Sequence, residues 1–235
     1  MKLLAFDTST ELLSIAVRRD GREWVHSGAG GAKSSAALIP CVLDLLAKAE
    51  LAPNDLDAIV FGRGPGSFTG LRTACSVAQG LAFGARRGQG AGVPVLPVDT
   101  LLAVAEVARM ESGATRVLAL LDARMDEVYS AAHIWEGTAW ATSTAISVGK
   151  PEQLALPAGE DWVLAGNVWA AYGERVPTAL ADLPRIEAVP NASALLSLAP
   201  AMLSAGLAVS ADQALPLYIR DKVAQTTAER AVAKS

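Results

Sequence analysis

The 235-residue sequence is poor in the residues that build metal centres and disulfides. It contains two cysteines, Cys41 and Cys75, and two histidines, His26 and His133. Each cysteine lies in an apolar helical pattern, and neither histidine has a histidine, cysteine or acid at ligand spacing. We therefore expect buried structural thiols, ordinary strand histidines and no metal site.

Excess positive charge and long apolar runs are also missing. The formal net charge is -4 at pH 7, so no general basic field draws the chain to nucleic acid or membranes. No apolar run reaches the roughly 18 residues that span a bilayer. The opening "MKLLAFDTST" is interrupted by Asp7, which makes it too short for a signal peptide and typical of a first strand. A cytoplasmic protein is the resulting expectation.

A glycine-rich turn, "GRGPGSFTGLR" over residues 62–72, lacks the lysine of a phosphate-binding P-loop. Leu71 stands in the place of that lysine, and Thr69 stands where a dinucleotide-binding turn needs its third glycine. The turn follows the buried-strand pattern "LDAIVF" and precedes a helix rich in small residues.

The turn has two interpretations. Its glycines and Pro65 let the chain leave the strand sharply, and Ser67 or Thr69 can cap the next helix. In the first interpretation the turn aims that helix at a partner subunit. In the second it cradles phosphate.

Two copies of one strand-strand-strand-helix-strand unit are predicted. The first strand of the opening unit ends at Asp7, and "VLALLDARMDEVYSAAHIWEGTAW" repeats the pattern with Asp122 in the matching place. Apolar spacing predicts helices over 35–51, 69–87, 99–111, from about 168, and over 192–203. This is the α/β arrangement of the duplicated actin-like ATPase fold (ASKHA, RNase H-like). We expect two subdomains, residues 1–98 and 99–235.

In that fold, the turns after the first strands hold phosphates between the two halves. An Asp-Thr-Ser turn can hold Mg²⁺ and phosphate, but the same side chains also satisfy turn backbones. The predicted nucleotide seam, vestigial if the second role applies, consists of Asp7, Thr8, Ser9, Asp122 and Gly166.

Four segments together resemble the bacterial TsaB (YeaZ) family over nearly the whole chain: "AFDTST", "DLDAIVFGRGPGSFTGLR", "LDARMDEVY" and "PLYIR". The resemblance implies a part in making the threonylcarbamoyl modification on adenosine 37 of ANN-decoding tRNAs. It implies partnership with TsaD, which holds the metal and transfers the group, and with the P-loop ATPase TsaE. It also implies contact with tRNA through the complex and a homodimer when alone.

The resemblance further implies no catalytic residue and no intrinsic cofactor, with ATP or ADP bound at the subunit or complex level. TsaD carries its metal histidines on a helix near the end of its first domain. The corresponding stretch here, about 99–111, contains no histidine.

The helices over 35–51 and 69–87 carry apolar or small side chains on more than the one stripe that a sheet covers. Arg72 is the single charged residue between Thr69 and Ala85, and it opposes the positive helix end, so we expect an acid to hold it, either within the chain or across the interface. The predicted partner surface comprises Leu38, Val42, Leu45, Pro65, Gly66, Ser67, Phe68, Arg72, Ser76, Gly80 and Gly84.

Two functions follow from these patterns. The first is a non-catalytic scaffold subunit of the tRNA-modifying complex. The alternative is an ATP-dependent small-molecule kinase or ATPase that uses Asp7, Thr8 and Asp122 around Mg-ATP. A peptidase is disfavoured, because no nucleophile, base and orienting acid can be assembled.

Overall fold

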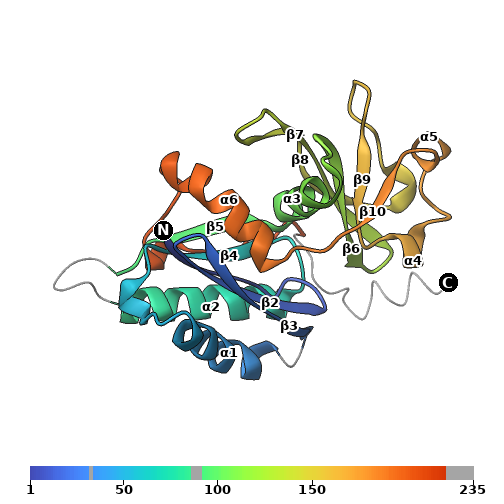
Figure 1. Ribbon diagram of the computed structural model, residues 1–235. Coiled ribbons are helices and arrows are strands. Elements are labelled where there is room, and N and C mark those ends of the chain that lie inside the picture. Colours follow the sequence, from blue (N-terminus) through green and yellow to red (C-terminus); the bar gives the residue numbers. More distant parts are fainter. Residues whose placement is uncertain (32–33, 86–91, 221–235) are drawn as a thin grey trace, which may run out of the picture.

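The computed structural model describes residues 1–31, 34–85 and 92–220 and contains two five-stranded mixed sheets (Figure 1). The first sheet has the order β3-β2-β1-β4-β5, and the second has the order β8-β7-β6-β9-β10. The first-sheet strands are β1 (Lys2–Asp7), β2 (Leu12–Arg19), β3 (Arg22–Ala29), β4 (Ala58–Gly64) and β5 (Val95–Asp99). The second-sheet strands are β6 (Arg116–Arg124), β7 (Glu127–Trp135), β8 (Trp140–Gly149), β9 (Val163–Gly166) and β10 (Arg185–Glu187).

The two sheets share one topology. In each, the first strand pairs antiparallel with the second and parallel with the fourth, and the fifth extends the parallel side. The duplication predicted from the repeated pattern is therefore confirmed, and Asp7 and Asp122 lie near the ends of the equivalent strands β1 and β6.

Helices cover both faces of the first sheet (Figure 1). The helices are α1 (Ser34–Lys48), α2 (Phe68–Gly84), α3 (Thr100–Ser112), α4 (Trp169–Tyr172), α5 (Thr178–Ala181) and α6 (Ala192–Ser204). The described residues also include the 3₁₀ turns η2 (Pro53–Asp55), η3 (Pro151–Gln153) and η4 (Ala211–Gln213). Leu4 and Phe6 of β1 pack toward α1 and α2, whereas Leu3 and Ala5 pack toward α6. This two-sided burial explains why the strands are continuously apolar.

The helix α6 follows the second sheet in the chain but packs on the first. Leu195 and Ala199 share a core with Leu3 and Val60. The helix begins at an Asn191 cap, and the Ala192 amide donates to Ser14 Oγ on β2 at 2.9 Å. The chain thus returns to the first half after completing the second.

Differences from the predicted elements lie mainly in the second half. The helix expected from about Val168 is a single turn, α4, which ends at Tyr172, and the short strand β10 was not predicted. The helix expected over 35–51 ends at Lys48, and Glu50 has a left-handed φ of 53°. Residues 86–87 of the predicted second helix lie outside the described residues. Within those residues, no helix is both long and apolar enough to cross a bilayer.

Candidate functional site

The glycine-rich turn between β4 and α2 is packed against the turn after β1. A Cβ atom at Gly62, Gly66 or Gly70 would lie between 1.8 and 2.5 Å from an atom of residues 7–9. Real Cβ atoms do not approach so closely, so these glycines allow two loops of the first half to interlock. The spaces that a phosphate cradle would leave open at these positions are filled by the chain itself.

A segment from the end of the chain covers the same turn. We call residues 209–220 the C-terminal strap. Val209 bridges to Val95 at the edge of β5, and the Leu217 amide donates to the Arg63 carbonyl at 2.7 Å. Gly64 has a φ of +123°, and its Cβ would lie 2.6 Å from the Leu217 carbonyl oxygen. Glycine is required here both by the backbone conformation and by the strap.

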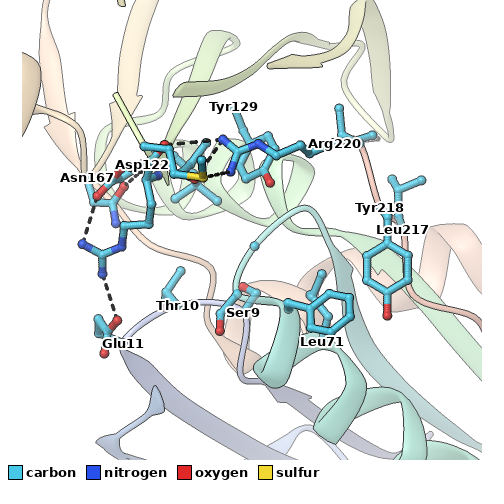
Figure 2. A pocket seen from close by; sticks show the side chains of 18 residues that line it. Ser9, Thr10, Glu11, Leu71, Asp122, Tyr129, Asn167, Leu217, Tyr218 and Arg220 are labelled. Carbon is cyan, nitrogen blue, oxygen red and sulfur yellow. Dashed lines mark hydrogen bonds and ion pairs between the residues drawn. The ribbon is translucent and has the colours of Figure 1, made fainter. Parts of the chain in front are cut away.

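A cavity of about 320 Å³ lies between the two halves. Figure 2 shows Glu11 of the first half and Asp122 of the second on facing sides of it. Of the predicted seam residues, Ser9 and Asp122 line the cavity, and Gly166 precedes the lining residue Asn167. Asp7 and Thr8 are fully buried and are not among the lining residues.

The Asp7 side chain is held by its own turn. Its Oδ1 accepts hydrogen bonds from the Ser9 amide at 2.8 Å and the Ser9 hydroxyl at 2.7 Å. Its Oδ2 is buried and has no hydrogen-bond partner among the residues that the structure describes. Burial raises the pKa of Asp7 to about 6, although both bonds from Ser9 act to lower it. The Thr8 hydroxyl donates to the Gly70 carbonyl at 2.7 Å. These contacts are those of a turn that satisfies backbone groups.

Asp122 is engaged in the same way. Its Oδ1 accepts from the Arg124 amide at 2.7 Å and from the Tyr172 hydroxyl at 3.0 Å, and its own amide donates to Asn167 Oδ1 at 3.0 Å. Gly166 lets β9 approach β6, because a Cβ there would lie 1.7 Å from the Leu120 carbonyl oxygen. The carboxylate and the glycine therefore both hold the second half together at the seam.

Three arginines fix the turn of residues 124–126, whose three non-glycine residues all have left-handed φ angles of 55–67°. The arginine of the turn reaches Glu11 across the cavity at 2.9 Å, which links the two halves. Arg175 pairs with the turn's aspartate, and Arg220 of the strap pairs with Glu127. The cations nearest the seam are thus neutralised by acids of this chain.

Part of the predicted partner surface is corrected by the structure. Leu38, Val42 and Leu45 are at most 4% exposed and belong to the core between α1 and the first sheet, so they cannot contact a partner. The large exposed apolar side chains of α1 are instead Ile39 and Leu43, at 44% and 49%. The apolar periodicity correctly predicted a wide stripe but not which part of it faces the sheet.

The predicted partner-surface residues in the body of α2 are exposed, whereas the opposite face of the helix is buried. Ser76, Gly80 and Gly84 are exposed, and a Cβ at either glycine would meet no atom within 4 Å. Ala74 and Ala78 form the buried face. At the start of the helix, Ser67 is the cap, and its hydroxyl accepts from the Gly70 amide at 3.5 Å. Ser67 and Phe68 are exposed, Gly66 is partly buried and Pro65 is buried.

Among the described residues, aromatic rings hold Arg72, and no acid does, which corrects one of the two expectations for this arginine within that part of the chain. Its guanidinium carbon lies 3.8 Å from the centre of the Phe68 ring, and its Nε donates to the Tyr218 hydroxyl at 3.0 Å. Tyr218 lies 146 residues further along the chain, so no local pattern could have indicated it.

Within the part of the chain that the structure describes, neither histidine belongs to a larger cluster of ligands. His26 Nε2 lies 3.5 Å from Cys41 Sγ, and His133 is buried, which lowers its pKa to about 4 despite the nearby charge of Asp99. Across the described ranges, no group of three or more His, Cys, Asp or Glu side chains is arranged to hold a metal ion.

Comparisons with known proteins support the resemblance drawn from the sequence motifs. A family model described as "TsaD: tRNA N6-adenosine threonylcarbamoyltransferase" matches residues 29–228. The tRNA threonylcarbamoyladenosine biosynthesis protein TsaB of Escherichia coli (strain K12) is 37% identical over 232 residues, which cover 95% of this chain and 96% of that protein. The chain belongs to the TsaB (YeaZ) family.

Two further TsaB-family proteins agree closely with this chain. The TsaB protein of Haemophilus influenzae is 35% identical over 234 residues, covering 95% of both chains. A solved structure, YeaZ from Pseudomonas aeruginosa, is 42% identical and superposes with a TM-score of 0.83 over 92% of this chain and 99% of that one. The actin-like fold predicted from the duplicated units is therefore the TsaB-family fold.

Proposed function

We propose that this chain is a non-catalytic subunit of the complex that adds the threonylcarbamoyl group to N6 of adenosine 37 in ANN-decoding tRNAs, and that it acts by dimerising with TsaD. Its TsaB-family relatives are named as tRNA threonylcarbamoyladenosine biosynthesis proteins, which supports a role in that modification. TsaE and tRNA are further partners in this proposal, with tRNA bound through the assembled complex.

The outer faces of α1 and α2 carry the proposal. These two helices lie side by side under the first sheet (Figure 1). Their exposed side chains include Ile39, Leu43 and Phe83, the last being 63% exposed. On α2, the only charged side chain is Arg72. A helix that packs only on its own sheet normally has a charged outer face, so this surface is suited to burial against another subunit.

The contacts at the seam favour a structural over a catalytic role. Asp7 is buried and accepts its hydrogen bonds from Ser9, and Asp122 contacts Arg124 and Tyr172. A phosphate or metal ion at Asp122 would have to displace these partners, and Asp7 is buried away from the lining of the cavity. The helix α3, which corresponds to the histidine-bearing helix of TsaD in the resemblance, contains no histidine.

The alternative is an ATP-dependent kinase or ATPase of the same fold, or nucleotide binding at the level of the complex. The observation that favours it is the cavity between the halves, which is at the small end of the range for small-molecule sites. Tight ATP binding by the isolated chain, with turnover lost in Asp7→Ala, would favour this alternative over the scaffold.

A substitution in the middle of α2 tests the docking face. Gly80→Arg places a long charged side chain on the outer face without a clash inside the monomer, since nothing lies within 4 Å of its Cβ. We expect the folded variant to lose binding to TsaD and to lose its own homodimer. Pull-down with TsaD and light scattering measure the two associations.

The matched control is Ala201→Arg, which places the same side chain on the exposed surface of α6. This variant should bind TsaD normally. Thermal unfolding establishes that both variants are folded. A folded Gly80→Arg protein with unchanged affinity for TsaD would place the interface elsewhere.

A further inference from the structure

The start of α2 and the C-terminal strap together form an exposed aromatic cluster. Phe68 is 39% exposed, and Tyr218 is 46% exposed. Their ring centres lie 5.3 Å apart with an angle of 34° between the ring planes. Figure 2 shows Tyr218 beside this end of the helix, contributed by the strap. Leu215 of the strap, at 61%, adds a further exposed apolar side chain.

Arg72 completes the cluster and has no acidic partner among the described residues. Phe68 supports one face of its guanidinium, and the Tyr218 hydroxyl accepts from Nε. An arginine side chain has five N–H donors, so one bond to Tyr218 leaves the terminal NH₂ groups available. The rings orient the guanidinium plane without neutralising its charge.

We propose that Phe68, Arg72 and Tyr218 form a carboxylate-binding end of the surface that docks TsaD, and that the C-terminal strap is therefore part of that surface. This inference rests on the proposed function. A guanidinium whose plane is fixed can accept a carboxylate with two parallel hydrogen bonds. The matching feature of TsaD is an aspartate or glutamate surrounded by apolar side chains.

The charges on α1 and α2 favour a different subunit over a second copy of this chain. A two-fold interface would present the same patch twice, and a carboxylate for Arg72 would have to come from α1, α2 or the strap. The acids of these elements are Asp44, which already pairs with Lys48 at 2.7 Å, and Asp212, which already accepts a hydrogen bond from the Ser210 hydroxyl at 2.6 Å. A partner that brings its own carboxylate therefore fits this patch better.

Calorimetric titration of full-length variants with TsaD tests the cluster. Arg72→Gln should weaken binding about 10- to 100-fold, because the carboxylate of TsaD is left at the interface without its partner. Tyr218→Ala should weaken binding about tenfold through the loss of the ring and the orienting bond. Arg72→Lys should recover only part of the affinity, because an ammonium cannot form the paired hydrogen bonds.

Arg185→Gln is the matched control. Arg185 is also stacked on an aromatic ring, at 5.1 Å from the centre of Trp169, but lies in the second half of the molecule. It should bind TsaD with wild-type affinity. An equal loss in Arg185→Gln would show a general charge effect and overturn the proposal.

The other outcomes separate this inference from the proposed function. If Gly80→Arg abolishes TsaD binding while Arg72→Gln and Tyr218→Ala leave it unchanged, the cluster has no part in docking. The proposal that TsaD docks on the outer faces of α1 and α2 is then retained. If none of the three changes binding, both proposals fail. If Arg72→Gln weakens self-association alone, a second copy occupies the cluster and the proposal is overturned.

Discussion

At the end of β1, the Asp7 carboxylate is completely buried and uses only one of its two oxygens. Oδ1 receives both bonds from Ser9, and Oδ2 occupies the space where a side chain at Gly62 would be. Burial without a cation makes the charged form costly, which is why the pKa of Asp7 rises to about 6. The ionised form of Asp7, the residue that the kinase or ATPase alternative would use around Mg-ATP, therefore destabilises the fold at neutral pH.

The free-energy cost of burying the ionised Asp7 carboxylate depends on pH. The unfolded chain releases the Asp7 proton near pH 3.8 and the folded chain near pH 6, so folding is progressively less favourable as pH rises between these values. The full effect is about 3 kcal/mol above pH 7. Asp7→Asn removes this titration, so its stability relative to the wild type should increase by about that amount between pH 4 and pH 8. Urea unfolding across this range measures it.

Asp182→Asn is the control, because Asp182 is exposed at the end of α5. It should show no comparable change with pH. A flat difference between Asp7→Asn and the wild type would mean that the buried carboxylate ionises as easily as in the unfolded chain. Burial of the ionised Asp7 carboxylate would then not destabilise the folded protein.

At the scale of elements, α2 contains glycines with opposite roles. Gly70 faces the turn after β1, where its Cβ would lie 1.8 Å from the Thr8 carbonyl oxygen. Gly80 faces outward, with nothing within 4 Å of its Cβ position. One helix therefore requires glycine on its inner side, whereas on its outer side glycine leaves a bare surface and weakens the helix.

Alanine at these two positions should change stability in opposite directions. Gly80→Ala should stabilise the protein by roughly 0.5 to 1 kcal/mol, because alanine favours the helix and meets no obstacle. Gly70→Ala should destabilise it by several kcal/mol, because the helix must move away from the Thr8 backbone. Urea unfolding of the two variants checks this. Equal effects would show that the packing at the start of α2 can relax.

The sequence predicted those features that depend on residues close together in the chain, and it did not predict contacts between distant residues. Apolar periodicity and turn residues predicted the strands, α1, α2, α3 and α6, and the repeated aspartates predicted equivalent places in two halves. Apolar periodicity and turn residues are local signals, and the aspartates recur in a repeated sequence pattern, so each can be recognised without knowledge of the fold. The sequence did not show that Ile39 rather than Leu38 faces outward, because adjacent apolar residues extend the stripe in both directions. The Arg72–Tyr218 contact joins distant parts of the chain, which only the fold brings together.

At the scale of the whole molecule, the two halves are joined by networks on separate elements. At the cavity, Glu11 and Arg124 pair across the seam. Elsewhere, the buried carboxylate of Glu106 on α3 accepts hydrogen bonds from Arg109, Trp140 of β8 and Ser197 of α6. The strap adds a third link from α2 to the β6–β7 turn through Arg220. The docking proposed for α2 would therefore take place on an element that is tied to the second half.

The pairing of arginines with acids limits the affinity of the isolated chain for nucleic acid. Nucleic-acid affinity comes mainly from lysine and arginine side chains that replace counterions on phosphates. Here the net charge is -4, and many arginines already pair with acids, among them Arg18, Arg19, Arg63, Arg109, Arg124, Arg175 and Arg220. In each of these pairs the acid offsets the positive charge that the arginine would present to a phosphate.

We therefore expect the isolated protein to bind an ANN-decoding tRNA no more tightly than about 10⁻⁵ M at physiological salt, with affinity rising when TsaD is added. Fluorescence anisotropy with labelled tRNA, repeated over a series of salt concentrations, measures both the affinity and the number of phosphates contacted. A scaffold without its own tRNA site should give a shallow salt dependence alone and a steeper one in the complex. Submicromolar binding by the isolated chain would instead mean that it carries a tRNA surface of its own, and the proposal that tRNA is bound through the complex would be wrong.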